Sequence, residues 1–383
     1  MAEFDMGLVQ RGARNRRTPY HEAAQRHAPL GYTVYNHMYF PIRFDTFEAE
    51  FDALLNDVTV WDVAVERCLE ISGPDGFTFA QLLTPRDLSR CAVGQAKYVL
   101  ICDRDGGIIN DPVLTRMDED TFWFALASSD ALLFARGLRN AYPDLDVTIR
   151  EADVAPMQIQ GPKSKDLMRA LLGEEVLDLK YYFWRRFDVD GIPVVVTRTG
   201  WTSEVGYEIY LEDTSRGTDL WEKVMEAGAP FNVRPTGPSD IRRIEGGIFN
   251  WGADMTYENN PYEMGLGRLV DDLRGEACIS IAALEGIASG GVERRINGVE
   301  LDGAPFPALN NTKWPALHGD VVVGKVTSAI HSPRLHTNIG YCWLPIALSQ
   351  PGASVRVETE WGSRTATVVA MPFVDPDKRI PVS

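Results

Sequence analysis

The pattern of hydrophobic and polar positions divides the chain into amphipathic helices and short strands. The helical spacing of apolar residues predicts helices at 47–56, 131–141, 167–172, 219–227 and 237–246. Runs rich in Val, Ile, Tyr and Phe lie between them and end at Gly, Pro or Asp, as strands do. From residue 294 the pattern changes to short strands with Gly and Pro turns, at 299–301, 321–329, 338–342, 354–358 and 365–369. This spacing predicts a small antiparallel β-barrel, and the Gly, Ala and Ser residues of 282–291 predict a loop before it.

Residues 194–212 carry the most informative pattern. Two β-rich runs, 194–198 and 206–211, flank a turn that contains Gly, Thr, Ser and Glu, which predicts a hairpin with an exposed tip. Because side chains alternate along a strand, Glu208 points to one face and Tyr207 to the other. A carboxylate there suits a planar ligand with two parallel N–H donors, such as a pterin or guanine edge. An ordinary amphipathic hairpin with solvated acids is the alternative.

A second candidate carboxylate follows a hairpin turn predicted at 103–107. Asn110 and Asp111 precede Pro112, whose nitrogen has no proton to donate to a β-ladder. We therefore expect Asp111 at a strand edge or bulge, where its carboxylate can reach a cavity. The alternative is an Asp that caps a turn through its own backbone.

Three aromatic residues are candidates for lining a pocket. In the run 181–184, Tyr182 and Trp184 share one face if the run is a strand, because alternate residues point the same way. Trp61 lies in a β-rich stretch beside Asp62. Packing in a core or an interface is the alternative for these rings.

Composition and charge narrow the class of protein. The 383 residues suggest two or three domains, and 45% hydrophobic with 24% charged residues is typical of a globular chain. The net charge of −16 argues against broad binding to nucleic acid or an anionic membrane, which needs a basic face. No apolar run reaches the roughly eighteen residues of a membrane span.

Several chemistries lack their motifs. The five cysteines are scattered without a CxxC pair, which predicts no disulfide framework and no zinc site and fits a reducing cytoplasm. The chain has no GxGxxG, GxxxxGK[ST] or HExxH motif, so dinucleotide, P-loop and zinc-protease chemistry have no support. No metal site is predicted.

Motifs along the chain are similar to those of one known family. The segment RTGWTSEVGYE at 198–208 resembles the RTGYTGEDGFE signature of the glycine-cleavage T-protein family, whose members bind tetrahydrofolate. GKVTSAIHSP at 324–333 resembles the family's GxVTSGxxSP, so the resemblance spans nearly the whole chain. Further segments are similar to the tetrahydrofolate-dependent dimethylsulfoniopropionate demethylases of this family, namely YTVYNHM at 32–38, VWDVAVER at 60–67 and IQGPKS at 159–164.

Two departures from the family pattern bear on function. Ser239 stands where the T-protein has an Arg at a helix start, and Ala253 stands where the family has an Asn before Asp254. The demethylase branch also lacks the Arg. Its absence here therefore argues against a plain glycine-cleavage enzyme.

The resemblance implies an α+β fold with three domains, the folate-binding aminomethyltransferase-type arrangement that ends in an antiparallel β-barrel. The first domain is expected to comprise residues 1–52 and 148–255. The second is expected to comprise 53–147 and 256–283, and the barrel 284–383.

The resemblance also implies an enzyme that moves a methyl group from a small methylated donor to N5 of tetrahydrofolate, giving 5-methyltetrahydrofolate. Dimethylsulfoniopropionate, or a related sulfonium or betaine, is the expected donor. The alternatives are an aryl methyl ether demethylase, an aminomethyltransferase that works with a lipoyl carrier protein, and a folate-binding assembly factor. The last class carries a KGCYxGQE-like motif that this chain lacks.

The expected site residues follow from the resemblance and from side-chain chemistry together. Asp111 matches the family's catalytic Asp, and Glu208 is expected to anchor the pterin. The other candidates are Trp201, Glu204 and Tyr207 for cofactor binding, and Trp184, Tyr182 and Trp61 for substrate binding.

Overall fold

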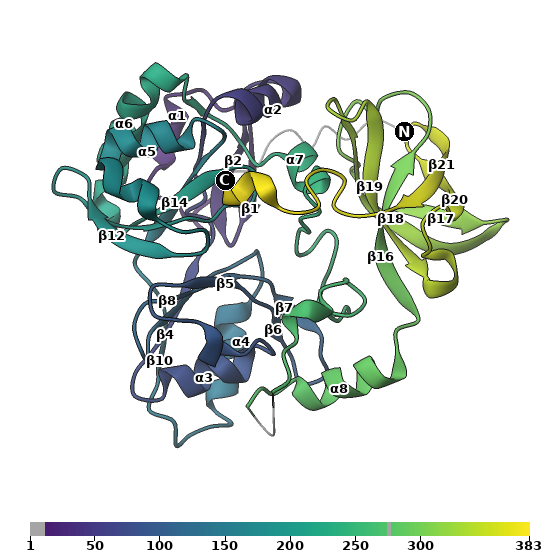
Figure 1. The fold of residues 1–383 in the computed structure, drawn as a ribbon, viewed down its shortest axis with the longest axis horizontal. Coiled ribbons are helices and arrows are strands. Elements are labelled where there is room, and N and C mark those ends of the chain that lie inside the picture. Colours follow the sequence, from purple (N-terminus) through teal and green to yellow (C-terminus); the bar gives the residue numbers. More distant parts are fainter. Residues whose placement is uncertain (1–11, 274–276) are drawn as a thin grey trace.

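The computed structural model describes residues 12–273 and 277–383, which form two β-sheets with helices and a closed β-barrel (Figure 1). Residues 1–11 and 274–276, which belong to the first and second predicted domains, lie outside the described residues. The predicted α+β fold class and C-terminal antiparallel barrel are confirmed. Among the described helices, none is long and apolar enough to cross a membrane.

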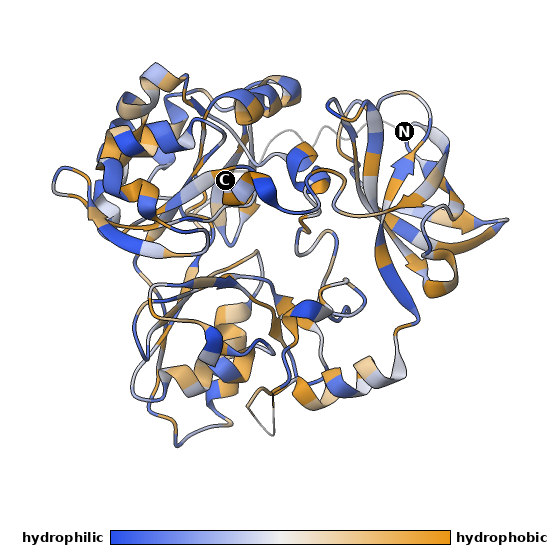
Figure 2. Ribbon diagram, viewed as in Figure 1, coloured by the Kyte–Doolittle hydropathy of each residue, from blue (hydrophilic) through white to orange (hydrophobic). Residues whose placement is uncertain are grey.

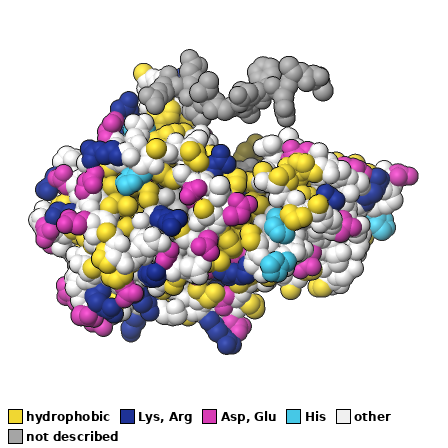
Figure 3. All heavy atoms as spheres, turned by 90° about the horizontal axis from the view of Figure 1, so that it is seen from above, with side chains coloured by type: hydrophobic (Ala, Val, Ile, Leu, Met, Phe, Trp, Pro, Cys, Tyr) yellow, Lys and Arg dark blue, Asp and Glu magenta, His cyan; other side chains and the backbone are white. Residues whose placement is uncertain are grey.

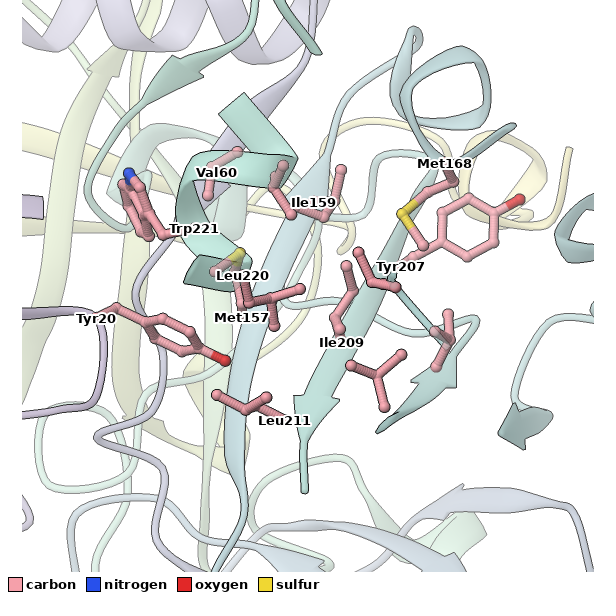
Figure 4. Packing of buried hydrophobic residues seen from close by; sticks show 14 of the residues in the cluster. Tyr20, Val60, Met157, Ile159, Met168, Tyr207, Ile209, Leu211, Leu220 and Trp221 are labelled. Carbon is pink, nitrogen blue, oxygen red and sulfur yellow. The ribbon is translucent and has the colours of Figure 1, made fainter. Parts of the chain in front are cut away.

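The six-stranded sheet packs one apolar face against helices. Its strand order is β12 (Trp184–Asp188), β13 (Pro193–Thr197), β14 (Gly206–Leu211), β11 (Ala155–Gln160), β3 (Thr59–Trp61) and β15 (Arg234–Pro235). Neighbouring strands are antiparallel except β3 and β15. The helices on this face are α1 (His21–Gln25), α5 (Ser164–Leu172) and α6 (Gly217–Gly228). The cluster between sheet and helices includes Tyr20, Met157, Ile159, Met168, Tyr207, Ile209, Leu211, Leu220 and Trp221 (Figure 4).

Strand β3 joins this sheet by pairing with β11, although the predicted boundary between the first and second domains lies at residue 53. The chain enters the five-stranded sheet only with β4 (Cys68–Ser72). By strand pairing, the change from one sheet to the other therefore falls after Trp61. The division into domains itself stays a prediction.

The five-stranded sheet is antiparallel throughout. Its order is β10 (Thr148–Glu151), β4, β9 (Phe122–Ala125), β8 (Val113–Arg116) and β5 (Ala96–Tyr98). Helices α3 (Gly76–Leu83) and α4 (Ala131–Arg139) pack on it through Phe79, Leu83, Phe122, Phe124 and Ala135. Two separate hairpins occur, β1 (Gly31–Tyr35) with β2 (Met38–Arg43), which precedes the six-stranded sheet, and β6 (Ile101–Cys102) with β7 (Ile108–Asn110). The second confirms the hairpin predicted around 103–107.

The barrel closes because β16 pairs with both β19 and β21. Its order is β16 (Arg294–Leu301), β19 (Thr337–Pro345), β18 (Val321–Ser332), β17 (Trp314–His318), β20 (Ser354–Thr359) and β21 (Gly362–Val369). Figure 2 shows hydrophobic and hydrophilic segments mixed along these strands, as expected when alternate residues face the barrel core. The five predicted barrel strands are confirmed. The sequence pattern missed β17, which contains Pro315, a residue that argues against a strand.

The predicted helices are present with small changes in their bounds. Helix α2 (Phe47–Asn56) matches its prediction, and the Thr46 side chain caps it by accepting a hydrogen bond from the Ala49 N–H. Helix α7 (Asp240–Glu245) begins where Ser239 Oγ accepts from the Arg242 N–H. The loop predicted at 282–291 is wrong, because α8 (Ile281–Gly290) occupies it. Alanine favours helix, and this helix packs Leu284 against Gly106.

The remaining elements are short. They are α9 (Arg379–Val382) and the 3₁₀ helices η1 (Leu88–Arg90), η2 (Glu174–Asp178), η3 (Thr214–Arg216), η4 (Ala229–Phe231), η5 (Gly267–Leu269) and η6 (Ile346–Leu348). Residues 370–383, named the tail below, lead from the barrel past α7 to the six-stranded sheet (Figure 1). On the face drawn in Figure 3, basic and acidic side chains are interspersed.

Candidate functional site

The face of the six-stranded sheet opposite the helices is polar and buried. Gln158 and Glu208 are cross-strand partners on β11 and β14, and Thr197 on β13 lies opposite Glu208. Tyr210 follows on the same face of β14. All four residues are buried. Burying polar groups costs free energy unless they have partners, so this face is the candidate site.

Glu208 is held by four uncharged donors. The Gln158 amide donates to Glu208 Oε1 at 2.7 Å. The hydroxyls of Thr199, Thr197 and Tyr210 donate to Oε2, the last two at 3.4 Å. Burial raises the pKa of Glu208, although these hydrogen bonds act in the opposite direction. An added N–H donor or positive charge would therefore stabilise the ionised carboxylate.

Gln158 leaves one buried acceptor without a partner. Its Nε2 donates to Glu208, whereas its Oε1 has no hydrogen-bond partner among the residues that the structure describes. An unpartnered buried oxygen costs roughly 1–3 kcal/mol. The side chains of Glu208 and Gln158 thus offer neighbouring acceptors, which fits the edge of a planar ligand with adjacent N–H donors.

Asp111 lies between β7 and β8, in the predicted second domain. The Tyr98 hydroxyl donates to Asp111 Oδ2 at 3.0 Å. Burial raises the pKa of Asp111 to about 7, against the hydrogen bond from Tyr98, which lowers it. A carboxyl group with this pKa exchanges a proton near neutral pH, as a general base must.

Glu66 connects the two predicted carboxylates. It lies between β3 and β4, and burial raises its pKa well above the usual value. The charges of Glu208 and Asp111 raise it further, so Glu66 lies within electrostatic range of both carboxylates. The main influences on the pKa values of the three groups are burial, neighbouring carboxylates and hydrogen bonds from uncharged groups. The site therefore favours ligands that are cationic or rich in N–H donors.

Two tyrosines lie within electrostatic range of these carboxylates. Burial raises the pKa of Tyr35, and the charges of Glu66 and Asp111 raise it further. Burial also raises the pKa of Tyr182, with further contributions from Tyr181 and Glu208. Neutral phenol rings beside an acidic cluster provide an aromatic surface that suits a cation.

Glu204 lies outside this cluster, in an internal ion network. Arg242 Nε donates to Glu204 Oε1 at 2.7 Å, and Arg334 NH2 lies 3.6 Å from the same oxygen. Glu245 joins the network through Arg242 at 3.9 Å and Arg334 at 3.7 Å. Because Arg334 lies between β18 and β19, Glu204 ties the hairpin to the barrel.

The indole rings of Trp61 and Trp201 share one apolar cluster. Trp61 is buried and donates its Nε1–H to Thr59 Oγ1 at 3.0 Å. Trp201 and Tyr35 pack against the same cluster, which also contains Met38. The guanidinium carbon of Arg243 lies 5.8 Å from the centroid of the Trp201 ring. The protein thus supplies its own cation to Trp201.

Tyr207 packs away from Glu208, whereas Trp184 lies on the same face of the sheet as Glu208. Tyr207 points to the helix-covered face of the sheet, as the alternation along the strand predicted. Trp184 donates its Nε1–H to the Arg116 carbonyl at 2.9 Å. Tyr182 precedes β12 and has a φ of 62°, so it does not alternate with Trp184 within one strand. That both rings bind substrate stays a prediction. Of the predicted substrate-binding rings, Tyr182 thus lies within electrostatic range of Glu208, and Trp184 lies on the Glu208 face of the sheet.

The exposed tip predicted for the hairpin is also wrong. Thr202 is fully buried, and its hydroxyl donates to Gln160 Oε1 at 2.7 Å. The Gln160 amide lies so close to Gly200 and Gly206 that a Cβ at either position would come within 2.2–2.4 Å of it. A larger residue at either position would thus displace the Gln160 amide from its hydrogen bonds to Thr202 and to the carbonyls of Thr199 and Tyr207.

Family membership follows from sequence comparison over most of the chain. The GCVT N-terminal domain matches residues 16–272, and the glycine cleavage T-protein C-terminal barrel domain matches residues 294–375. The chain therefore belongs to the glycine-cleavage T-protein family, in agreement with the sequence-based prediction.

Individual relatives refine this assignment. Dimethylsulfoniopropionate demethylase DmdA from Ruegeria pomeroyi is 40% identical over 95% of this chain and 98% of that protein. An aminomethyltransferase from Symbiobacterium thermophilum is 30% identical over 94% and 97%. The crystal structure of glycine cleavage system aminomethyltransferase T from Bartonella henselae matches with a TM-score of 0.83 at 20% identity, covering 94% of this chain and 98% of that one. The two chains share this fold.

Glu204 is expected to act in stability rather than in binding. Glu204→Ala leaves the buried Arg242 without its nearest carboxylate, which should cost roughly 3 kcal/mol of folding free energy and lower Tm. Glu212→Ala, which removes a carboxylate paired with a largely exposed Arg186, is the matched control and should change Tm little. A stable Glu204→Ala variant with weakened ligand binding would return Glu204 to the binding residues.

Proposed function

We propose that this enzyme transfers a methyl group from a small methylated donor to tetrahydrofolate, giving 5-methyltetrahydrofolate. Dimethylsulfoniopropionate or a related sulfonium or betaine is the donor. The observation that carries the proposal is Glu208, a buried carboxylate held by neutral donors beside the unpartnered Gln158 Oε1. The kinship with DmdA supports the choice of donor.

The acceptors on the sheet face fit a pterin. Its edge presents adjacent N–H donors, which match the neighbouring oxygens of Glu208 and Gln158. When bound, tetrahydrofolate supplies the N5 nitrogen that takes the methyl group. Glu208 and Gln158 orient the cofactor, and the donors from Thr197, Thr199 and Tyr210 hold the Glu208 carboxylate in place.

Asp111 is proposed as the catalytic base. A nitrogen that gains a methyl group must lose a proton, and a carboxylate with a pKa of about 7 accepts it at neutral pH. The Tyr98 hydroxyl orients this carboxylate through its hydrogen bond to Oδ2. Asp111 thus removes the proton while Glu208 binds.

The charge of the site favours a cationic donor. A methyl group on a sulfonium transfers readily because the leaving sulfur becomes neutral. The acidic cluster and the rings of Tyr35 and Tyr182 attract the cation, and binding donor and acceptor in line at short distance speeds the transfer. The donor is the only small-molecule partner proposed besides the folate, and the absence of nucleic-acid and membrane partners stays a prediction.

The second candidate is an aminomethyltransferase that works with a lipoyl carrier protein, because relatives with that name are 28–30% identical. Ser239 weighs against it. Its side chain caps α7, at the position where the T-protein has an Arg. We also propose a cytoplasmic location, which fits five buried cysteines without a disulfide.

A panel of methyl donors tests the proposed function directly. The purified protein, incubated with tetrahydrofolate and dimethylsulfoniopropionate, a betaine or an aryl methyl ether, is expected to form 5-methyltetrahydrofolate with a cationic donor. Chromatography measures the product. Turnover of the aryl ether alone would reject the cationic donor, and turnover of an aminomethylated lipoyl carrier alone would favour the second candidate.

Glu208→Ala is expected to weaken tetrahydrofolate binding by roughly ten- to a hundredfold, because a lost charge-assisted partner costs about 1.5–3 kcal/mol. A fluorescence titration measures the affinity, and circular dichroism should find the fold intact. Glu212→Ala, on a residue that directly follows β14, serves as the control. If Glu208→Ala binds tetrahydrofolate with unchanged affinity, Glu208 has a structural role in the sheet and does not bind the pterin.

Asp111→Asn is expected to lower kcat by about 10²–10⁴-fold, the usual contribution of a general base. In the unaltered enzyme the rate should rise as pH increases through about 7, because only ionised Asp111 accepts a proton. The pH profile of kcat/KM measures this acidic limb, which the variant should lose. Asp105→Asn, on an exposed carboxylate in the preceding turn, should keep it. An acidic limb that persists in Asp111→Asn assigns the base to another group.

A further inference from the structure

The tail connects the barrel to the hairpin that carries Glu208 (Figure 1). The Val374 N–H donates to the Glu245 carbonyl at 2.9 Å. Lys378 Nζ donates to the Gly246 carbonyl at 3.0 Å. Both contacts are to the end of α7, so they fix the path of the tail before it reaches the hairpin.

Arg198 binds the end of the tail. It is 3% exposed, and its guanidinium donates to the carbonyl oxygens of Pro381 at 3.0 Å and Ser383 at 2.7 Å. It also donates to the Gly206 carbonyl at 3.1 Å, at the start of β14. Its Cζ lies 5.0 Å from the centroid of the Tyr207 ring. Hydrogen bonds from a charged planar donor are strong and directional, so this is a firm link between tail and hairpin.

Arg198 also lies between the two threonines that hold Glu208. Alternate residues point to opposite faces, so Arg198 faces the tail while Thr197 and Thr199 face the carboxylate. The pairing of β13 with β14 ends at Thr197. Beyond that point, the bond from Arg198 to Gly206 helps to hold the hairpin together. The side-chain contacts of Arg198 thus hold one side of the segment whose other side presents Thr197 and Thr199 to Glu208.

We propose that Arg198 is a positioning residue, which uses the tail to hold Thr199 and Glu208 in the geometry that binds the pterin. The proposal rests on the proposed function, because it assigns folate to Glu208. It also gives the barrel a part in folate binding, since the tail that reaches Arg198 begins at the barrel.

A double-mutant cycle tests this link. Arg198→Gln and deletion of residues 379–383 each remove one side of it, and each is expected to weaken tetrahydrofolate affinity by about tenfold. The tetrahydrofolate affinity of the combined variant should be no lower than that of Arg198→Gln alone, because both changes break the same contact. At saturating tetrahydrofolate, the KM for the donor should stay within about twofold of the unaltered enzyme.

Two further variants complete the design. Arg198→Lys keeps the charge but loses the planar fork, and is expected to restore part of the affinity lost in Arg198→Gln. Arg379→Gln removes an exposed ion pair with Asp377 and leaves both carbonyl contacts in place. It should bind folate as the unaltered enzyme does.

Hydrogen exchange provides a readout that needs no ligand. The amides of 199–208 are expected to exchange faster in Arg198→Gln and in the deletion variant, and at the normal rate in Arg379→Gln. Normal folate affinity in the first two variants, or additive losses in the double variant, would overturn the positioning role alone. Unaltered enzyme that binds no tetrahydrofolate would overturn the proposed function and, with it, this role.

Discussion

Strand β14 is buried on both faces, and this constraint decides where the chemistry lies. Tyr207 and Ile209 pack against the helices. Glu208 and Tyr210 therefore point to the opposite face of the sheet, where Tyr210 packs with Cys68 and Trp123 of the five-stranded sheet. Water does not reach a carboxylate there freely. The sheet compensates with donors from both neighbouring strands, Gln158 on β11 and Thr197 on β13. Packing on one face thus creates a demand for polar partners on the other.

Buried charges hold the barrel in place beside the sheets. Arg243 on α7 pairs with Asp240 at 2.6 Å and with Asp254 at 2.9 Å. Asp254 also accepts hydrogen bonds from Thr327 and Ser328 of β18. Buried ion pairs are demanding in geometry, because a charge left without its partner costs several kcal/mol. Helix α7 thus fixes the barrel through directional contacts, where an apolar surface alone would allow it to slide.

Several features were predictable from local sequence because the physics that produces them is local. Helix α2 has helical spacing and a Thr46 cap, and both β13 and β14 alternate between buried faces. Gln158 and Gln160 are two polar residues on one face of β11, and this pattern in the sequence could have indicated the site. The predictions relied on family motifs and did not use it. Glu66 lies within the motif VWDVAVER, but it was not predicted as a site residue. Nothing local distinguished it from a surface acid.

The sequence by itself determined the fold class, the barrel and the family, and it singled out Asp111 and Glu208 as candidate site residues. Only the tertiary structure decided that Glu204 serves an ion network, that Trp184 packs against Arg116, and that Glu66 joins the carboxylates. The reason is physical. Periodicity shows to which face of a helix or strand a side chain points. The residue that the side chain contacts there depends on how the separate sheets pack together. Contacts between distant segments, such as Arg198 with the tail, leave no periodic trace in the chain.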